Sequence, residues 1–437
     1  MCLRNLISGS ALAVALSGTL PSLSTFAAVA TTGDPLLEKL VQKGILTQQE
    51  ADELLKDGSG QSHSKMSFAD WVEQVRFSGD VRVRMDSING EDPAFVDRTR
   101  YRFRARFGVT LDLANDLEVG VRLTTTSDGD PISQNVTFAD NASKKGVAFD
   151  EVYVRFAPLH HGDWTGGITA GKFSNPIHYP STILFDKDYT PEGFNQVVSY
   201  DLAENHTISL ILTQYVLDEL KSSSRNPWQF GGQVRWDAEW CPRLKSSIGA
   251  AAYSILHPES LTTTNVPYIG QGNTRTVAGV LVNDYDIFYG DAGLTYTFDS
   301  APLYRGKFPV YAYGNAIYNF GADRENIGYG VGIRFGKASK RGQWELNYLW
   351  THMEADAWWD QIVESDFGAV WTAAPAAGKA GYYSGTNVQG HWIKGTYAIF
   401  DQWSVSVAYF ITGLIQDPNP AVSNDTTRLF VETSVKY

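Results

Sequence analysis

The chain has 437 residues, of which 19% are charged and 13% aromatic, and its formal net charge at pH 7 is −12. The aromatic content excludes a disordered chain, and the net negative charge argues against a nucleic-acid-binding protein, which would need a basic surface. After the N-terminal segment, no stretch approaches the roughly 18 apolar residues of a membrane-spanning helix. A large all-β protein, rich in glycine and tyrosine, is the remaining class.

Residues 1–30 have the pattern of a secretory signal peptide. Arg4 supplies the initial positive charge, residues 11–20 are apolar, and residues 28–30 (Ala-Val-Ala) form a cleavage site of the A-x-A type. Cleavage would remove one base and no acid, so the charge of the mature chain would be −12 − 1 = −13. Cys241 is the only cysteine beyond this segment, which excludes an internal disulfide.

Residues 34–57 are the only other segment with helical spacing. Its first half repeats leucine and valine three and four positions apart, and residues 47–50 (Thr-Gln-Gln-Glu) form a capping box for a second helix. We expect a short periplasmic helical hairpin, followed by a linker over 58–74. Two such short helices bury too little surface alone, so the hairpin either self-associates, docks onto the main body or serves as a spacer.

From residue 75 to residue 437 the hydrophobic period changes from 3.6 to 2. Between Arg98 and Leu113, the odd-numbered residues from Tyr101 onward are apolar, whereas five even-numbered positions are arginine. Alternate residues of a strand point to opposite faces. The pattern therefore predicts a strand with one apolar face and one strongly basic face. The five arginines are Arg98, Arg100, Arg102, Arg104 and Arg106.

About sixteen alternating segments follow one another, and most have the roughly 9–11 residues that a tilted strand needs to cross a bilayer. They lie at 75–85, 98–113, 117–126, 147–156, 164–173, 195–201, 207–216, 228–237, 244–255, 286–298, 310–319, 328–336, 343–353, 388–399, 403–411 and 427–437. Short connections alternate with long ones at 127–146, 174–194, 256–285 and 354–387. Short turns on one side and long loops on the other are typical of outer-membrane barrels.

These features predict an all-β fold: a transmembrane antiparallel β-barrel of about 16 strands, preceded by the short helical hairpin. No unpaired strand edge can face hydrocarbon, so a sheet that spans a membrane must close on itself. An even number of strands would place both termini in the periplasm. A Greek-key sandwich would not produce the alternation of short and long connections.

The order of several segments resembles the putative porins of the Gram-negative outer membrane. The resemblance rests on residues 77–84 (Phe-Ser-Gly-Asp-Val-Arg-Val-Arg), the arginine ladder at 98–106, and residues 117–126, 171–176 and 186–193. The chain also ends in an aromatic residue, Tyr437, at an outward position, like the C-terminal strands of bacterial outer-membrane barrels. The resemblance implies a sixteen-stranded homotrimeric barrel through which small hydrophilic solutes or ions diffuse passively.

The arginines of strand 98–113 should face the interior of such a barrel, because one arginine facing lipid would cost about 2–4 kcal/mol at the bilayer midplane. Neighbouring strands add three arginines with the same orientation: Arg82, Arg84 and Arg122. We expect these eight arginines to line the pore. They could form a basic wall that tunes passage by charge, a salt-bridged lining, or both. The carboxylates considered for such a lining are Asp80, Asp112 and Glu118.

The long connection at 174–194 is acidic. It carries Asp186, Asp188 and Glu192, with Lys187 among them. In general porins a comparable loop folds into the barrel, and the resemblance implies that these carboxylates lie at a constriction opposite the basic wall. The alternative is an ordinary solvated loop.

The sequence bears on two other classes of function. The long external loops would also suit a surface adhesin or binding scaffold, whereas a barrel enzyme would need catalytic residues that no G-x-S-x-G or H-E-x-x-H motif supplies. No cofactor or metal is expected: the His160-His161 pair has no third ligand nearby, and the aspartates at 128, 130, 140 and 150 lack a twelve-residue calcium loop. The preferred function is a non-enzymatic porin whose partners are membrane lipid and small solutes or ions.

Overall fold

The computed structural model describes residues 43, 47, 69–127, 129–266, 272–371, 380–417 and 423–437. The expected signal peptide (1–30), all but two residues of the helical hairpin (34–57) and most of the linker (58–74) lie outside the described residues. The barrel belongs to a compact unit that includes Glu73–Tyr437. Within the described residues, no helix is long and apolar enough to cross a membrane.

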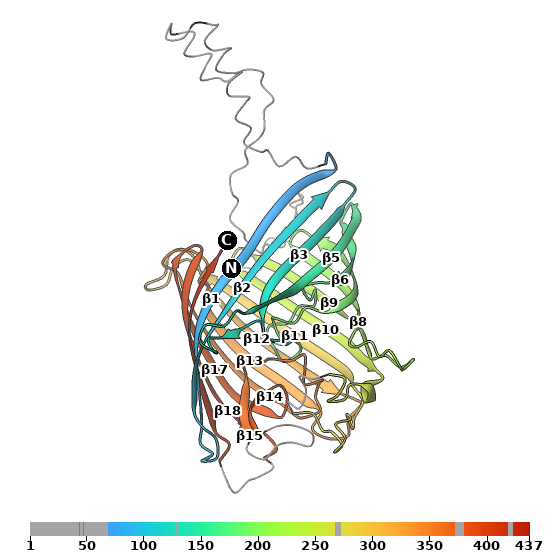
Figure 1. Cartoon of the computed structure of the whole chain (residues 1–437). Coiled ribbons are helices and arrows are strands. Elements are labelled where there is room, and N and C mark those ends of the chain that lie inside the picture. The colour runs from blue at the N-terminus through green and yellow to red at the C-terminus, as the bar shows by residue number, and fades with distance from the viewer. Residues whose placement is uncertain are drawn as a thin grey trace. The chain divides into compact units, whose positions relative to one another are not determined.

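Sixteen antiparallel strands form a closed barrel (Figure 1), as the alternating pattern predicted. They are β1 (Val72–Gly90), β2 (Arg98–Leu113), β3 (Leu117–Thr126), β5 (Gly146–His161), β6 (Trp164–Lys172), β7 (Glu192–Ala203), β8 (His206–Val216), β9 (Trp228–Cys241), β10 (Leu244–Leu256), β11 (Asp286–Phe298), β12 (Phe308–Asn319), β13 (Ile327–Gly336), β14 (Trp344–Met353), β17 (Val388–Phe400), β18 (Trp403–Leu414) and β19 (Thr426–Lys436). Each strand pairs with the preceding and following barrel strands, and β1 pairs with β19 along the seam from Asp80↔Lys436 to Gly90↔Thr426. The sheet therefore has no free edge to expose to lipid.

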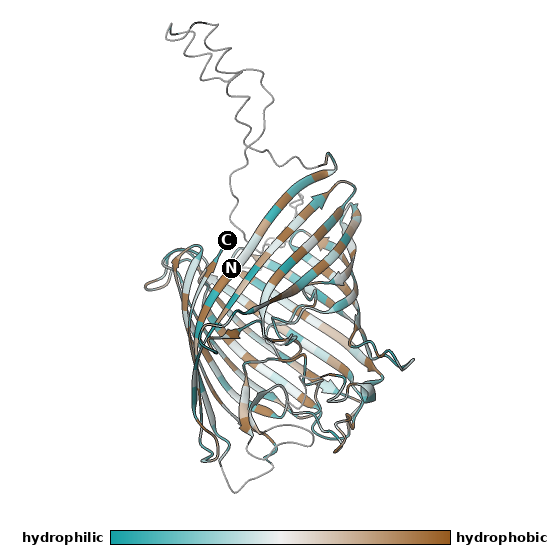
Figure 2. Cartoon of the chain, viewed as in Figure 1, coloured by the Kyte–Doolittle hydropathy of each residue, from teal (hydrophilic) through white to brown (hydrophobic). Residues whose placement is uncertain are grey.

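The two faces of the barrel wall differ in polarity. On β2, the outward rings of Tyr101 and Phe107 are 54% and 44% exposed, whereas the inward Arg102 and Arg104 are each 8% exposed. The hydropathy of the strands alternates in the same way around the wall (Figure 2). The apolar residues form an outer surface suited to hydrocarbon, and the charged residues lie inside.

A β-bulge in β5 changes this alternation at one point. The register between β3 and β5 shifts between Arg122, which pairs with Glu151, and Leu123, which pairs with Phe149. Asp150 is the additional residue. Both Asp150 and Glu151 are buried on the inner side, while Phe149 and Val152 remain exposed. The bulge thereby presents two consecutive carboxylates to the interior without turning an apolar residue inward.

Within the described residues, four short elements lie outside the sixteen barrel strands. They are β4 (Val136–Thr137), which pairs with β2, the 3₁₀ turn η1 (Pro258–Ser260), and β15 (Gly368–Trp371) with β16 (Gly381–Ser384), which form a hairpin. The strand pattern did not predict them, because segments of two to four residues carry too little alternation to be recognised.

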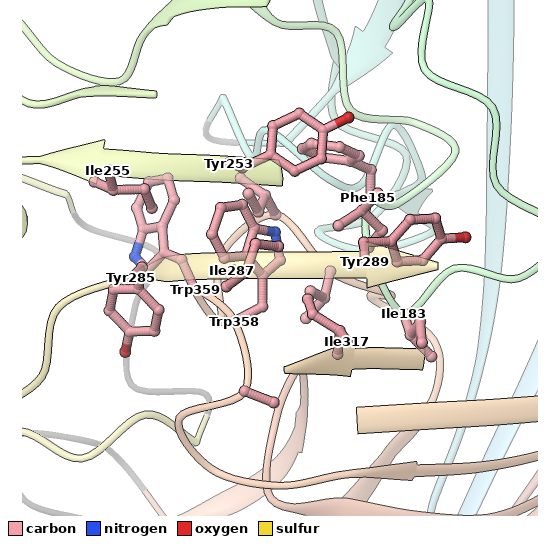
Figure 3. Close-up of a cluster of buried hydrophobic side chains, with 14 of the residues drawn as sticks. Ile183, Phe185, Tyr253, Ile255, Tyr285, Ile287, Tyr289, Ile317, Trp358 and Trp359 are labelled. Atoms are coloured by element: carbon pink, nitrogen blue, oxygen red, sulfur yellow. The ribbon is translucent and has the colours of Figure 1, made fainter. Parts of the chain in front are cut away.

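The apolar core lies inside the barrel, where three long loops pack against the inward side chains of the wall. The main cluster joins residues of the 173–191, 256–285 and 354–371 segments to β8, β10, β11, β12 and β14. Trp358 is fully buried and contacts the rings of Tyr253 and Tyr285, each with a centroid separation of 6.2 Å (Figure 3). The long loops therefore fold inward and are held there by hydrophobic packing.

The β15–β16 hairpin forms a second interior cluster on another part of the wall. Phe367 and Trp371 pack with Phe410 and Phe430 of β18 and β19. The backbone N–H of Val370 donates to the Thr426 hydroxyl at 2.9 Å. The hairpin is therefore attached to the wall by both apolar contacts and hydrogen bonds.

Candidate functional site

Seven inward arginines gather where β19, β1 and β2 meet, and we call them the arginine cluster. They are Arg82 and Arg84 of β1, Arg100, Arg102, Arg104 and Arg106 of β2, and Arg428 of β19. Arg428 completes the group across the closure of the barrel. Of these residues, the sequence analysis missed only Arg428.

Carboxylates of the neighbouring strands lie within 2.9 Å of five members of the cluster, and at 3.7 Å from Arg82 and 3.9 Å from Arg102. Asp80 accepts hydrogen bonds from Arg104 at 2.8 Å and Arg106 at 2.5 Å. Glu432 of β19 accepts one from Arg84 at 2.6 Å. The most buried carboxylate is Asp86, which lies within 2.7 Å of Arg100 and 2.9 Å of Arg428. The strand register thus places acids and bases of separate strands side by side.

Two loops add a carboxylate each. Asp188, on the loop between β6 and β7, lies 2.9 Å from Arg104. Asp366, on the loop between β14 and β17, lies 2.9 Å from Arg84 and 3.3 Å from Arg428. The acidic loop predicted from the sequence therefore contacts the arginines through Asp188, and a second inward loop, which the sequence analysis did not identify, contacts them through Asp366.

The two loops also hold each other. The N–H of Asp186 donates to the carbonyl of Ile362 at 2.7 Å, and its carboxylate accepts the N–H groups of Asp188 and Ser365, each at 2.7 Å. The hydroxyl of Thr182 donates to Glu364. Asp186 therefore shapes the turn that presents Asp188 and also joins the neighbouring loop, without itself contacting an arginine in the described structure.

The carboxyl groups where the two loops meet have pKa values shifted in opposite directions. Burial, reinforced by the charges of Glu364 and Asp188, holds the pKa of Asp186 well above its usual 3.8. Burial also raises the pKa of Glu364. For Asp366, burial opposes ionisation, but the charges of Arg84 and Arg428 outweigh it and hold its pKa below the usual value. Asp366 is therefore the ionised member that faces the arginine cluster.

A third loop, between β3 and β5, contacts the cluster through Asn135. Its side-chain oxygen accepts a hydrogen bond from Arg82 Nη2 at 2.7 Å, and its backbone oxygen accepts one from Arg102 Nη2 at 3.0 Å. Gln134 donates to Asp150 of the bulge at 2.7 Å. Burial raises the pKa of Asp130 on the same loop.

The other residues expected at the site lie outside the arginine cluster. Arg122 pairs with Asp150 at 2.5 Å and Glu151 at 2.8 Å. Arg98 is exposed at the start of β2. Glu192 is the first residue of β7 and pairs with Lys172 at 3.2 Å. The carboxylates Asp112 and Glu118 pair with Arg76.

The cluster is a desolvated network of fixed charges. Arg84, Asp86 and Arg428 are 4%, 0% and 2% exposed. Ionised groups in such surroundings interact more strongly than in water, and they need partners to offset their desolvation. Among the described residues, no group of three or more histidine, cysteine, aspartate or glutamate side chains is arranged to hold a metal ion. The arrangement can attract, repel or orient a charged solute.

Some of the missed residues had a signal in the sequence. Arg428 and Glu432 occupy even-numbered positions of a strand whose odd-numbered residues face outward. The alternation along a strand therefore predicts that both side chains point into the barrel. Asp86 has the same signal on β1. Asp366 lies in an irregular loop, where no period indicates the direction of a side chain.

Residues 92–268 match the family model described as Putative porin. This match confirms the resemblance found in the sequence. Among curated protein sequences, none is significantly similar to this chain.

Solved structures with a similar fold include three bacterial porins. The Pseudomonas putida OprB structure at high pH is 10% identical, with a TM-score of 0.53, and the match covers 89% of this chain and 96% of OprB. A Salmonella typhi OmpF complex with daunomycin is 9% identical, with a TM-score of 0.47, and the match covers 83% and 97%. A triple mutant of the Rhodopseudomonas blastica porin is 12% identical, with a TM-score of 0.44, and the match covers 83% and 100%. Of the three, OprB alone exceeds a TM-score of 0.5, and at its low identity it establishes the fold only.

The protein is located in the Gram-negative outer membrane. The family match and the porin fold support a channel in that membrane and point away from an enzyme. Fold alone does not determine which solute a channel passes.

Proposed function

We propose that the protein forms a water-filled channel for the passive diffusion of small hydrophilic solutes or ions, with charge selection at the arginine cluster. The observation that carries the proposal is the position of Asp188 and Asp366, two loop carboxylates that lie against arginines of β1 and β2. Fixed charges beside a confined passage act on the ions that pass, and charged rings set selectivity in many pores.

The packing of the interior supports a path beside these charges. The main apolar cluster occupies the side of β8 and β10–β14, and the second covers part of β17–β19. Apolar packing leaves no room for hydrated solutes, so we assign the hydrated path to the polar side, next to β1, β2 and β3. There the eight predicted pore-lining arginines and the acids of the loop between β6 and β7 would act on the solute. By resemblance to porins, we further propose a homotrimer.

An adhesin function has less support. An adhesin would rely on long loops that project outward, but the two longest connections contribute buried residues to the interior cluster, among them Leu261, Tyr285 and Trp358. Removing the 354–387 loop should therefore alter conductance. An adhesin would instead lose binding and keep its conductance.

The channel proposal is tested in planar bilayers with protein refolded in detergent. We expect stepwise conductance, with steps in groups of three if the trimer is correct. In a salt gradient, the variant R100Q/R102Q/R104Q should shift the reversal potential toward cation preference. The matched control is Arg76→Gln, because Arg76 pairs with Asp112 and Glu118 outside the cluster. A folded protein without channels would refute the function, and conductance with an unchanged reversal potential would refute charge selection.

A further inference from the structure

Two members of the arginine cluster have no carboxylate oxygen within 2.9 Å among the described residues. Arg84, Arg100, Arg104, Arg106 and Arg428 each have a carboxylate oxygen within 2.9 Å. Among the described residues, the carboxylate closest to Arg82 is Glu432 at 3.7 Å, and the one closest to Arg102 is Asp86 at 3.9 Å. We propose that Arg82 and Arg102 together form a binding subsite for a small oxyanion, such as inorganic phosphate or a carboxylate, on the path of the proposed channel.

The nearby carboxylates are already engaged by other bases. Glu432 accepts hydrogen bonds from Arg84 at 2.6 Å and Lys394 at 3.3 Å, and a further one from Ser406 at 3.0 Å. Asp86 accepts two hydrogen bonds from Arg428 and one from Arg100. Each carboxylate thus lies closer to another base than to Arg82 or Arg102.

The charge balance of the cluster agrees with these distances. Among the described residues, the seven arginines and Lys394 face five carboxylates: Asp80, Asp86, Asp188, Asp366 and Glu432. The positive charges at the cluster therefore outnumber the negative ones. A small anion would neutralise this surplus where it is located.

Each of these arginines also has an unused donor. Nε of Arg82 and Nε of Arg102 are buried and make no hydrogen bond with the described residues. A buried charged donor without an acceptor is costly, more so than a neutral one. The side chains as a whole are 15% and 10% exposed, so neither is completely enclosed.

Asn135 holds the two guanidinium groups as neighbours. It accepts a hydrogen bond from Arg82 through its side chain and one from Arg102 through its backbone. Both bonds use Nη2, which leaves Nε free on each side chain. A guanidinium presents its N–H groups in a planar fork that matches the oxygens of carboxylates and phosphates. Two preorganised forks favour an oxyanion over a neutral solute.

The test is equilibrium binding of radiolabelled inorganic phosphate to the full-length folded protein in detergent. Wild type should bind saturably, with competition by sulfate and acetate. R82Q and R102Q should each weaken binding at least tenfold. The matched control is Arg334→Gln, since Arg334 lies over the ring of Tyr311 on another part of the wall. No saturable binding by wild type, or equal binding by R82Q and R102Q, would overturn the subsite.

A second variant keeps the test valid if the arginine variants do not fold. Asn135→Asp leaves both arginines in place and supplies a resident carboxylate 2.7 Å from Arg82. It should abolish phosphate binding, and undiminished binding would contradict the proposal.

The subsite rests on the proposed channel only for its access route, and the two can fail separately. Phosphate should reduce chloride conductance of wild type at constant ionic strength and have at least tenfold less effect on R82Q. Conductance without phosphate binding overturns the subsite alone. Phosphate binding without conductance overturns the channel and supports the subsite.

Discussion

Arg428 of β19 and Asp86 of β1 are joined by two hydrogen bonds of 2.9 Å, although 342 positions separate them in the chain. Both side chains are almost completely buried. The pair crosses the seam at which the first and last strands meet, and Arg428 also contacts Asp366 of an inward loop. One ionic contact therefore connects barrel closure to the filling of the interior.

Replacing Asp86 by alanine should lower the free energy of unfolding by about 3–5 kcal/mol, because it leaves buried arginine charge without its carboxylate. Urea unfolding in lipid vesicles, followed by tryptophan fluorescence, measures the change. As a control, Arg243→Ala removes an exposed pair with Asp299 and should leave the transition unchanged. Equal effects of the two substitutions would contradict a stabilising role for the seam pair.

Asp188→Asn should shift the reversal potential toward anion preference and increase current noise. The substitution removes the carboxylate that pairs with Arg104, so the cluster gains unbalanced positive charge and the loop between β6 and β7 loses a tether. Single-channel recording in a salt gradient measures both effects. The control is Glu192→Gln, which changes the same charge on a residue that is paired with Lys172. We expect no shift from the control, and a shift of equal size would exclude a specific role for Asp188.

The contact between the two inward loops should weaken as pH rises above about 3.8. Below that value Asp186 is protonated whether or not the two loops contact each other. The contact buries Asp186 and raises its pKa, so with rising pH the proton is released first where the loops are separated. The contact therefore loses stability as pH rises, until Asp186 also ionises within the contact. Asp366 has the opposite sign, since its lowered pKa adds stability that is lost only as pH falls below the usual value.

Hydrogen exchange of the Ser365 N–H, which donates to Asp186, measures this effect after correction for the intrinsic exchange rate. Protection should fall with pH in the wild type and fall less in Glu364→Gln, which removes a neighbouring charge. The N–H of Val370, bound to Thr426, serves as a reference that should not respond. Protection of Ser365 that stays constant or rises over this range would show that burial of Asp186 does not control the contact.

Deleting Asp150 should leave the barrel able to fold. The deletion removes the bulge, after which Phe149 still points outward and Glu151 still points inward. Deleting Val121 from the facing strand should prevent folding, because a one-residue shift reverses every following side chain. Refolding yield and heat-modifiable migration on gels compare the two variants. Equal loss of folding would mean that the bulge residue is required for the barrel itself.

The barrel strands were predictable because lipid and interior impose opposite polarities on alternate residues. The ranges 98–113 and 117–126 agree with β2 and β3 at both ends. The same parity gives the inward orientation of Arg102 and Arg104. The bulge was not predictable, because an inserted residue is recognised only when the facing strand is known.

The alternation of odd and even positions could not identify the partners of the arginines. Asp80 was expected among them and does pair with Arg104, whereas Asp112 and Glu118 pair with Arg76. The choice depends on the strand register and on how far each side chain lies along the barrel. Asp366 depends on the path of an irregular loop, which is fixed by the packing of Trp358 and its neighbours and leaves no periodic pattern.

The apolar clusters inside the barrel have a consequence for biogenesis. Before β19 meets β1, the nascent sheet exposes hydrophobic surface on both sides: the outer belt that will meet lipid and the inner residues that will meet Trp358 and Phe367. Such an intermediate is more prone to aggregate than one with a polar inner face. Periplasmic chaperones would therefore have to shield both sides of the chain until it is inserted into the membrane and the barrel closes.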